Sequence, residues 1–215
     1  MNQSLDNTNN IELEVLEMTP HFIYGRLHHE ITDDIMDEIS DAVYDTDLSV
    51  SQIGCEDDSS ECNDVRKGSH VWVNDTPFTN NVLQQLALDA NEVLWNLADI
   101  DSEFPSIQYT LYDQPSDHYD WHQDHYAEEE DITGFHRKVS ISLCLSHDDM
   151  YEGAEFFIKD GSNTNVRYFK MRYGDFIVFP SDLEHRVNAL RSGSRLSLVV
   201  WYGTTLEEIA IEDQK

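Results

Sequence analysis

The sequence predicts a mainly β fold with flanking helices, in which two facing sheets form a jelly roll. Short segments that alternate apolar and polar residues follow one another closely from about residue 105 to 203. Such spacing is typical of double-sheet jelly rolls. Two stretches with helical periodicity precede these segments, and no internal repeat or low-complexity tract interrupts them. A chain of 215 residues with 40% hydrophobic residues can bury one sizeable core.

The N-terminal half is expected to supply helices that support one sheet. Residues 1–10 are polar and should form a flexible tail, while residues 11–16 alternate like a strand. Thr32 is expected to cap a helix with an apolar stripe, and Pro77 to open a second one. Between them, residues 45–69 contain few large apolar side chains and are expected to form a long loop. The predicted organisation is a single domain over residues 11–215, with a helical buttress at about 30–98.

The jelly-roll core is expected at about residues 105–203. Its strands are predicted at 107–111, 118–124, 139–145, 155–158, 166–171, 176–179, 185–190 and 195–202.

The charge balance argues against a polyanionic partner. Thirteen basic and 43 acidic residues give a net charge of −30, and Lys and Arg are scattered rather than gathered in a stripe. Nucleic acid is therefore not an expected partner. The acidity fits either attraction of a cationic peptide or a salt-adapted surface.

No apolar run of membrane-spanning length and no secretory signal is visible, so the expected location is cytoplasmic, without membrane association. The expected oligomeric state is a monomer or homodimer.

The three cysteines do not indicate a zinc site, because no C-x-x-C pair occurs. Cys144 lies in an apolar strand and is expected to pack. Cys55 and Cys62 could be free thiols or could close a small loop under oxidising conditions, and both readings stay open.

The most informative motif is His122-Gln123-Asp124, with His185 far downstream. On a strand, residues two apart point to the same face, so His122 and Asp124 can reach one metal ion together. Two His and one carboxylate form the facial triad of non-haem Fe(II), which leaves coordination positions open for a co-substrate and O2.

Other histidines are weaker candidates for that site. His125 would fall on the opposite strand face, and His118 would lie roughly 13 Å along an extended chain from His122. His136 and His147 border predicted loops and are expected to face solvent.

The segment from Tyr112 to Asp124 resembles the strand pair that carries the first two iron ligands in 2-oxoglutarate/Fe(II)-dependent dioxygenases of the prolyl 4-hydroxylase-like and PKHD-type hydroxylase branch. Further segments match later strands of that family: 138–146, 151–156, 173–180, 185–187 and 193–196. The resemblance covers residues 105–203. It implies a double-stranded β-helix (jelly roll, cupin-like) oxygenase fold, with Fe(II) held by His122, Asp124 and His185.

The same resemblance assigns the co-substrate contacts. Arg195, ten positions after His185, would pair with the far carboxylate of 2-oxoglutarate, and Tyr112 would hydrogen-bond 2-oxoglutarate. A guanidinium can bind a carboxylate through two parallel hydrogen bonds, which fits this role. Arg191, in a turn, is a weaker candidate. Ascorbate is a candidate reductant.

The chain departs from the family pattern at three places. Pro115-Ser116 replaces an expected glycine, Ala154 replaces the second glycine of Gly-Gly-Glu, and Cys144 lies where some relatives carry a hydroxyl. Residues 126–136 form an acidic insertion that could be a substrate-selecting lid or a plain connection.

The expected reaction is hydroxylation of an unactivated C–H bond, by resemblance that of a prolyl residue in a peptide or protein, with decarboxylation of 2-oxoglutarate to succinate. A free amino acid or other small molecule remains an alternative acceptor. A non-catalytic jelly-roll binding module is a rival from a different class. A nucleic-acid demethylase on this scaffold is disfavoured, because it would need a basic groove.

Overall fold

The computed structural model describes residues 13–44, 49–50, 65–74, 76–77, 79–97, 100–125, 135–161 and 165–205. The N-terminal part contains β1 (Leu13–Met18), β2 (Ile23–Leu27), α1 (His29–Tyr44), β3 (Ser49–Val50), β4 (Arg66–Lys67), β5 (Ser69–Val73), η2 (Thr79–Leu83), α2 (Gln84–Ala90) and η3 (Asn91–Trp95). The C-terminal part contains β6 (Asp101–Tyr112), β7 (His118–His122), β8 (Phe135–Cys144), β9 (Tyr151–Gly153), β10 (Phe156–Lys159), β11 (Val166–Phe169), β12 (Asp175–Pro180), β13 (His185–Val187), β14 (Leu190–Gly193) and β15 (Arg195–Thr205).

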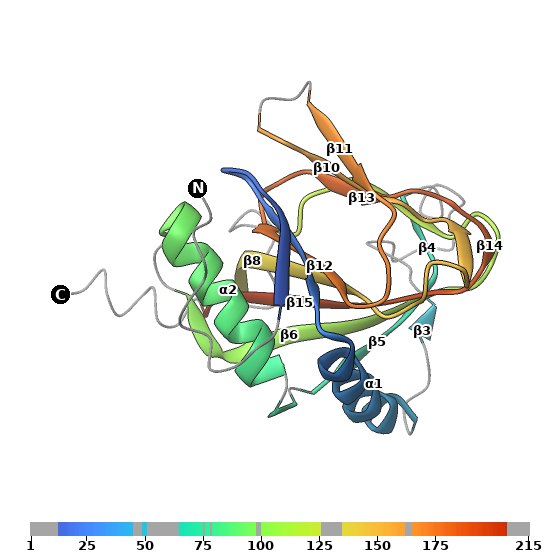
Figure 1. Ribbon diagram of the computed structural model, residues 1–215, viewed down its shortest axis with the longest axis horizontal. Coiled ribbons are helices and arrows are strands. Elements are labelled where there is room, and N and C mark those ends of the chain that lie inside the picture. The colour runs from blue at the N-terminus through green and yellow to red at the C-terminus, as the bar shows by residue number, and fades with distance from the viewer. Residues whose placement is uncertain are drawn as a thin grey trace.

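The strands form two main antiparallel sheets and a short ribbon. The eight-stranded major sheet has the order β1-β2-β12-β8-β15-β6-β5-β3, and the five-stranded minor sheet has the order β11-β10-β13-β7-β4. Strands β14 and β9 pair separately. In Figure 1 the strands β10, β11 and β13 lie across from β8, β15 and β6; α1 lies on the far side of the latter, and α2 runs past their left-hand ends. The predicted mainly β jelly-roll fold is confirmed.

The helices pack on the outer face of the major sheet because each presents an apolar stripe to it. Ile35 and Ile39 of α1, with Leu86 and Ala90 of α2, join one buried cluster with strand residues of the major sheet. A second cluster fills the space between the sheets; its largest members include Phe22, Tyr112, Tyr151, Phe156 and Phe179.

Alternation along β15 separates these two cores. Leu198 and Val200 belong to the helix-side cluster, whereas Arg195 and Ser197 line the cavity between the sheets. This is the two-residue periodicity expected of a strand. This alternation points the buried guanidinium of Arg195 toward the cavity between the sheets.

The start of the first helix differs from the prediction, whereas the second helical stretch includes Pro77 at its start, as predicted. Helix α1 begins at His29, three residues before Thr32, and the Thr32 hydroxyl donates to the His28 carbonyl from inside the helix. At the second helix, Thr76 and Thr79 each accept a hydrogen bond from the other's backbone N–H, so the pair satisfies amide groups that a helix start leaves unpaired. The helical stretch ends where Asn96 adopts a left-handed conformation.

Several strands were not predicted, notably β2, β4, β5 and β14. Two of them, β4 and the start of β5, fall at residues 66–69, within the stretch read as a long loop.

Residues 1–10, Cys55, Cys62 and residues 126–134 lie outside the described residues. None of the helices in the described ranges is both long and apolar enough to span a membrane.

Candidate active site

Two adjacent strands of the minor sheet bring the predicted histidines together. Strands β7 and β13 pair with His122 directly opposite His185. In each ring Nδ1 contacts the backbone carbonyl two residues earlier, that of Asp120 at 2.7 Å for His122 and that of Leu183 at 2.9 Å for His185. A carbonyl accepts only, so Nδ1 carries the proton and Nε2 is left as the free lone pair. Both rings are thereby fixed in the tautomer that can bind a metal.

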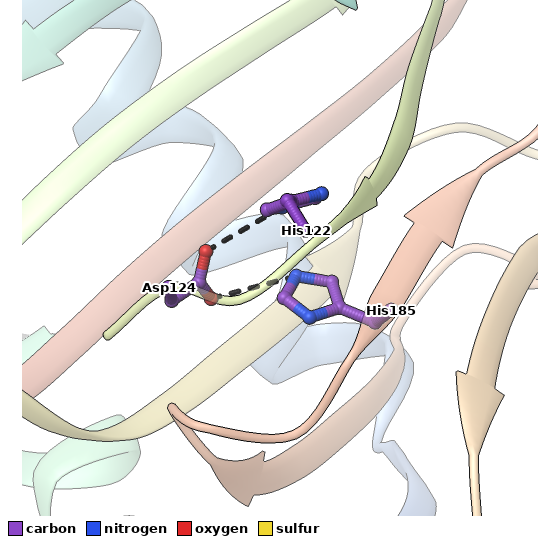
Figure 2. A group of neighbouring side chains, drawn as sticks. All are labelled: His122, Asp124 and His185. Atoms are coloured by element: carbon purple, nitrogen blue, oxygen red, sulfur yellow. Dashed lines mark ion pairs between the residues drawn. The ribbon is translucent and has the colours of Figure 1, made fainter. Parts of the chain in front are cut away.

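Asp124 completes the group from a turn rather than from the strand. Strand β7 ends at His122, two residues earlier than predicted. The backbone N–H groups of Asp124 and His125 both donate to the Ser181 carbonyl, at 2.8 and 2.9 Å, which bends the chain inward. The carboxylate then faces both imidazoles from one side, as Figure 2 shows, with its oxygens 3.6 Å from Nε2 of His122 and 3.5 Å from Nε2 of His185.

The three donors fit a divalent transition metal. One donor atom from each residue lies within 4.8 Å of the other two. Two ligands bound at roughly 2.1 Å to one ion are separated by about 3 Å when they are adjacent, so small adjustments would close the site. Among the described residues, this is the cluster of His, Cys, Asp and Glu side chains whose donors converge in this way.

The ionisation states also suit metal binding, which requires neutral imidazole and ionised carboxylate. Burial and the neighbouring His122 ring lower the pKa of His185 to about 4. Burial acts to raise the pKa of Asp124, but the imidazoles of His185 and His122 outweigh it and hold that pKa well below its usual range. Near neutral pH, His185 is neutral and Asp124 is charged.

The triad opens into a cavity of about 220 Å³ between the sheets. At its far wall lies Arg195, which is 1% exposed and sits opposite Tyr112 on the paired strands β15 and β6. Its guanidinium donates to the Ser197 hydroxyl at 3.2 Å and contacts the Met171 sulfur at 3.7 Å. Nε of Arg195 has no hydrogen-bond partner, and the ion pairs found among the described residues do not include Arg195. The structure thus places Arg195 and Tyr112 together in the cavity that also contains the triad.

The cavity wall also contains residues that the sequence analysis did not name as site residues, among them Arg66, Trp72, Gln108 and Trp201. The guanidinium of Arg137 lies 4.0 Å from the Trp201 ring centroid and 5.9 Å from that of Trp72. Trp72 could have been found, because the alternation of residues from Ser69 to Val73 indicates the strand on which it lies. Arg66 lies on a two-residue strand, which has no detectable pattern.

The rival histidines lie outside the triad. Nδ1 of His118 contacts the Ser116 carbonyl at 2.7 Å, and Nδ1 of His125 contacts the Arg137 carbonyl at 3.3 Å. His147 is exposed, as predicted. The prediction for His136 was wrong: it is 3% exposed, because it lies within β8, where it pairs with Thr204 of β15.

The departures from the expected motif have local structural consequences. Ala154 adopts a left-handed backbone conformation with φ of 50°, which glycine adopts more readily. Cys144 is fully buried, as predicted, with its sulfur 3.9 Å from the Tyr151 hydroxyl. Ser116, with φ of 76°, donates its backbone N–H to the Leu190 carbonyl.

A jelly roll that brings together two His, one Asp and a buried arginine is the arrangement that the resemblance to 2-oxoglutarate/Fe(II) oxygenases implies. Residues 107–203 match the sequence profile of the 2OG-Fe(II) oxygenase superfamily. The match covers a little under half of the chain and supports the resemblance seen in the motifs. Fe(II), 2-oxoglutarate and O2 are the cofactor and co-substrates that this family implies.

Curated proteins of similar sequence include PKHD-type hydroxylases. The chain is 30% identical over 130 residues to a PKHD-type hydroxylase of Crocosphaera subtropica, covering 60% of this chain and 57% of that protein. It is 32% identical over 77 residues to one from Idiomarina loihiensis, covering 36% of this chain and 34% of that protein. The chain therefore spans only about a third to a little over half of the length of these relatives.

Solved structures show the same fold. A Pseudomonas putida prolyl-4-hydroxylase superposes with a TM-score of 0.62 at 18% identity, covering 86% of this chain and 93% of that one. A Trichoplax adhaerens prolyl hydroxylase, in complex with a hypoxia inducible factor peptide fragment, gives a TM-score of 0.64 at 15% identity, covering 86% and 84%.

Proposed function

We propose that the protein is a 2-oxoglutarate- and Fe(II)-dependent dioxygenase that hydroxylates an unactivated C–H bond, with a prolyl residue in a peptide or protein as the favoured acceptor. In the balanced reaction, acceptor, O2 and 2-oxoglutarate give hydroxylated acceptor, succinate and CO2. One oxygen atom enters the new hydroxyl and the other enters succinate.

One observation carries this proposal: the His122, Asp124 and His185 donors converge at one end of a cavity whose far wall holds Arg195. The triad would hold Fe(II), and the iron would supply the oxidising chemistry. Arg195 would bind the distal carboxylate of 2-oxoglutarate, because a buried guanidinium gains most from a bidentate anion. The Tyr112 hydroxyl would donate a hydrogen bond to the same co-substrate.

Residues around the triad keep it in place. The Ser140 hydroxyl donates to Asp124 at 2.8 Å and lies 2.9 Å from the Ser181 hydroxyl. The Tyr119 ring stacks on His122 with 3.4 Å between centroids. These contacts orient the ligands before metal binds, which favours affinity and a defined geometry.

The test is succinate formation from 2-oxoglutarate with Fe(II) and ascorbate, together with mass spectrometry of proline-containing peptides for a gain of one oxygen. Asp124→Ala should abolish both signals. Asp120→Ala removes an exposed carboxylate from β7, the strand that carries His122, and should retain both signals. A fully active Asp124→Ala variant would refute the ligand assignment, and a wild-type protein that neither binds Fe(II) nor consumes 2-oxoglutarate would favour the binding-module alternative.

A further inference from the structure

The cavity contains a second buried cation that the proposed reaction does not use. Arg66 lies on β4, is 6% exposed and lines the same cavity as the triad. One of its terminal nitrogens donates to Oε1 of Gln108 at 2.6 Å. Its Nε has no hydrogen-bond partner, and the ion pairs found among the described residues do not include it.

Arg66 reaches the cavity because the chain passes directly from the minor sheet to the major sheet just after it. Strand β4 pairs with β7 of the minor sheet, whereas β5 pairs with β6 of the major sheet. Gly68 joins the two, and a Cβ at that position would lie 2.5 Å from the Tyr112 ring. Only glycine allows this approach, so β4 closes the side of the barrel and Arg66 reaches across to Gln108 on β6.

The position of Arg66 relative to the metal triad is well defined. Its guanidinium lies 4.8 Å from the centroid of the Tyr119 ring, which in turn stacks on His122. Burial raises the pKa of Tyr112, and the guanidinium groups of Arg66 and Arg195 partly offset that increase. Arg66 is therefore a neighbour of both the metal site and the co-substrate end of the cavity.

A buried charge without a counter-ion is costly, and proteins retain one where a ligand supplies the partner. The sequence holds 43 acidic residues, yet the partners of Arg66 among the described residues are neutral: the amide of Gln108 and the hydroxyl of Tyr112. Arg195 suffices for the distal carboxylate of 2-oxoglutarate. Among the described residues, the positive charge of Arg66 therefore has no acidic partner in the cavity that also contains the triad.

We propose that Arg66, with Gln108 and Thr110 beside it, binds a carboxylate of the acceptor. The acceptor is then a free amino acid or a chain that ends in a carboxylate near the hydroxylated residue. This inference rests on the proposed function and specifies its substrate class. A single guanidinium beside an amide and a hydroxyl matches the charge of one carboxylate, and the indoles of Trp72 and Trp201 would cover its apolar part.

The inference predicts discrimination between acids and their amides. Protein loaded with Mn(II) and N-oxalylglycine, an unreactive 2-oxoglutarate analogue, would be titrated by calorimetry with the twenty standard L-amino acids and their amides. N-acetylated Gly-Pro acid and its amide form a second arm that separates a free amino acid from a chain end. At least one acid should bind about tenfold or more tightly than its amide, the effect expected for a charged hydrogen-bond partner.

Two variants assign that preference to Arg66. Arg66→Gln removes the cation. Gln108→Glu keeps it but supplies an internal counter-ion and should preserve folding, because it adds an ion pair where a hydrogen bond exists. Both should erase the preference for acids. Lys67→Gln, the next residue on β4, is the matched control and should retain it.

The outcomes are decisive. Equal binding of acids and amides, absence of acid binding throughout the set, or a preference that survives in both variants would each overturn the inference. Acceptor-free decarboxylation of 2-oxoglutarate, measured on the Fe(II) protein, tests the proposed function separately. If decarboxylation is present and acids bind no more tightly than their amides, the proposed role of Arg66 is wrong and the proposed function stands.

Discussion

The Ser140 hydroxyl on β8 donates a hydrogen bond of 2.8 Å to the Asp124 carboxylate, whose oxygens face the two imidazoles. Both groups are buried, at 0% and 4% exposure. A partner of this kind limits the rotation of a metal-binding carboxylate, and its loss elsewhere lowers metal affinity. The two sheets thus act together at the site: the minor sheet carries both histidines, and the major sheet orients the carboxylate.

Replacing Ser140 with Ala should lower Fe(II) or Mn(II) affinity by about 10- to 100-fold, because the carboxylate loses its fixed orientation. Calorimetric metal titration measures this directly. Ser142→Ala is the matched control, since Ser142 lies two residues along the same strand and also lines the cavity. Equal metal affinity in wild type and Ser140→Ala would show that the turn at Ser181 alone positions Asp124.

Arg195→Met should separate stability from co-substrate binding. Without 2-oxoglutarate the variant should be as stable as wild type or more so, because the native guanidinium is buried without an acidic partner among the described residues. Adding 2-oxoglutarate at a hundredfold excess over its Kd should stabilise the Mn(II)-loaded wild type by about 2.7 kcal/mol and leave the variant unchanged. Thermal denaturation with and without co-substrate provides the measurement.

Arg191→Met is the control for that experiment, since Arg191 is exposed and contacts Glu155 at 3.5 Å. It should keep the stabilisation by 2-oxoglutarate. A similar stabilisation in Arg195→Met would mean that another cation of the cavity receives the distal carboxylate.

The motif, read together with the family resemblance, was enough to predict that His122, Asp124 and His185 converge, although Asp124 reaches the group from a turn and not from the strand. The same holds for Arg195, whose neighbours Leu196 and Leu198 mark the opposite face of β15. Burial of His136 could not be predicted, since it depends on pairing with a strand almost 70 residues away. The register β4–β7 that brings Arg66 to the cavity also arises from tertiary contact alone.

Metal-free protein should lose stability as the pH falls from about 6.5 to about 4. Burial and the His122 ring lower the pKa of His185 to about 4, whereas an unfolded histidine titrates near 6.5. Between these values the unfolded chain binds more protons at this residue, so acid favours unfolding, with a slope of at most about 1.4 kcal/mol per pH unit. Below about 4 this contribution is fully lost.

Urea denaturation of metal-free wild type and His185→Gln between pH 7.5 and 4 tests that expectation. The difference in unfolding free energy between the two proteins should shrink as the pH falls through this window. A pH-independent difference would mean that His185 is not held neutral by its surroundings.

Gly203→Ala should destabilise the protein by about 2 kcal/mol or more, because there is no room for a side chain at this bulge. A Cβ at Gly203 would lie 1.7 Å from the His136 carbonyl oxygen, where the register between β15 and β8 shifts. The strands can accommodate the methyl group only by separating, which costs ladder hydrogen bonds and displaces Trp201, two residues away at the cavity wall. Urea denaturation measures the loss, with the exposed Ser192→Ala as the control. A variant as stable as wild type would require β8 and β15 to separate here without cost, which the burial of Tyr202 and Thr204 on either side of Gly203 argues against.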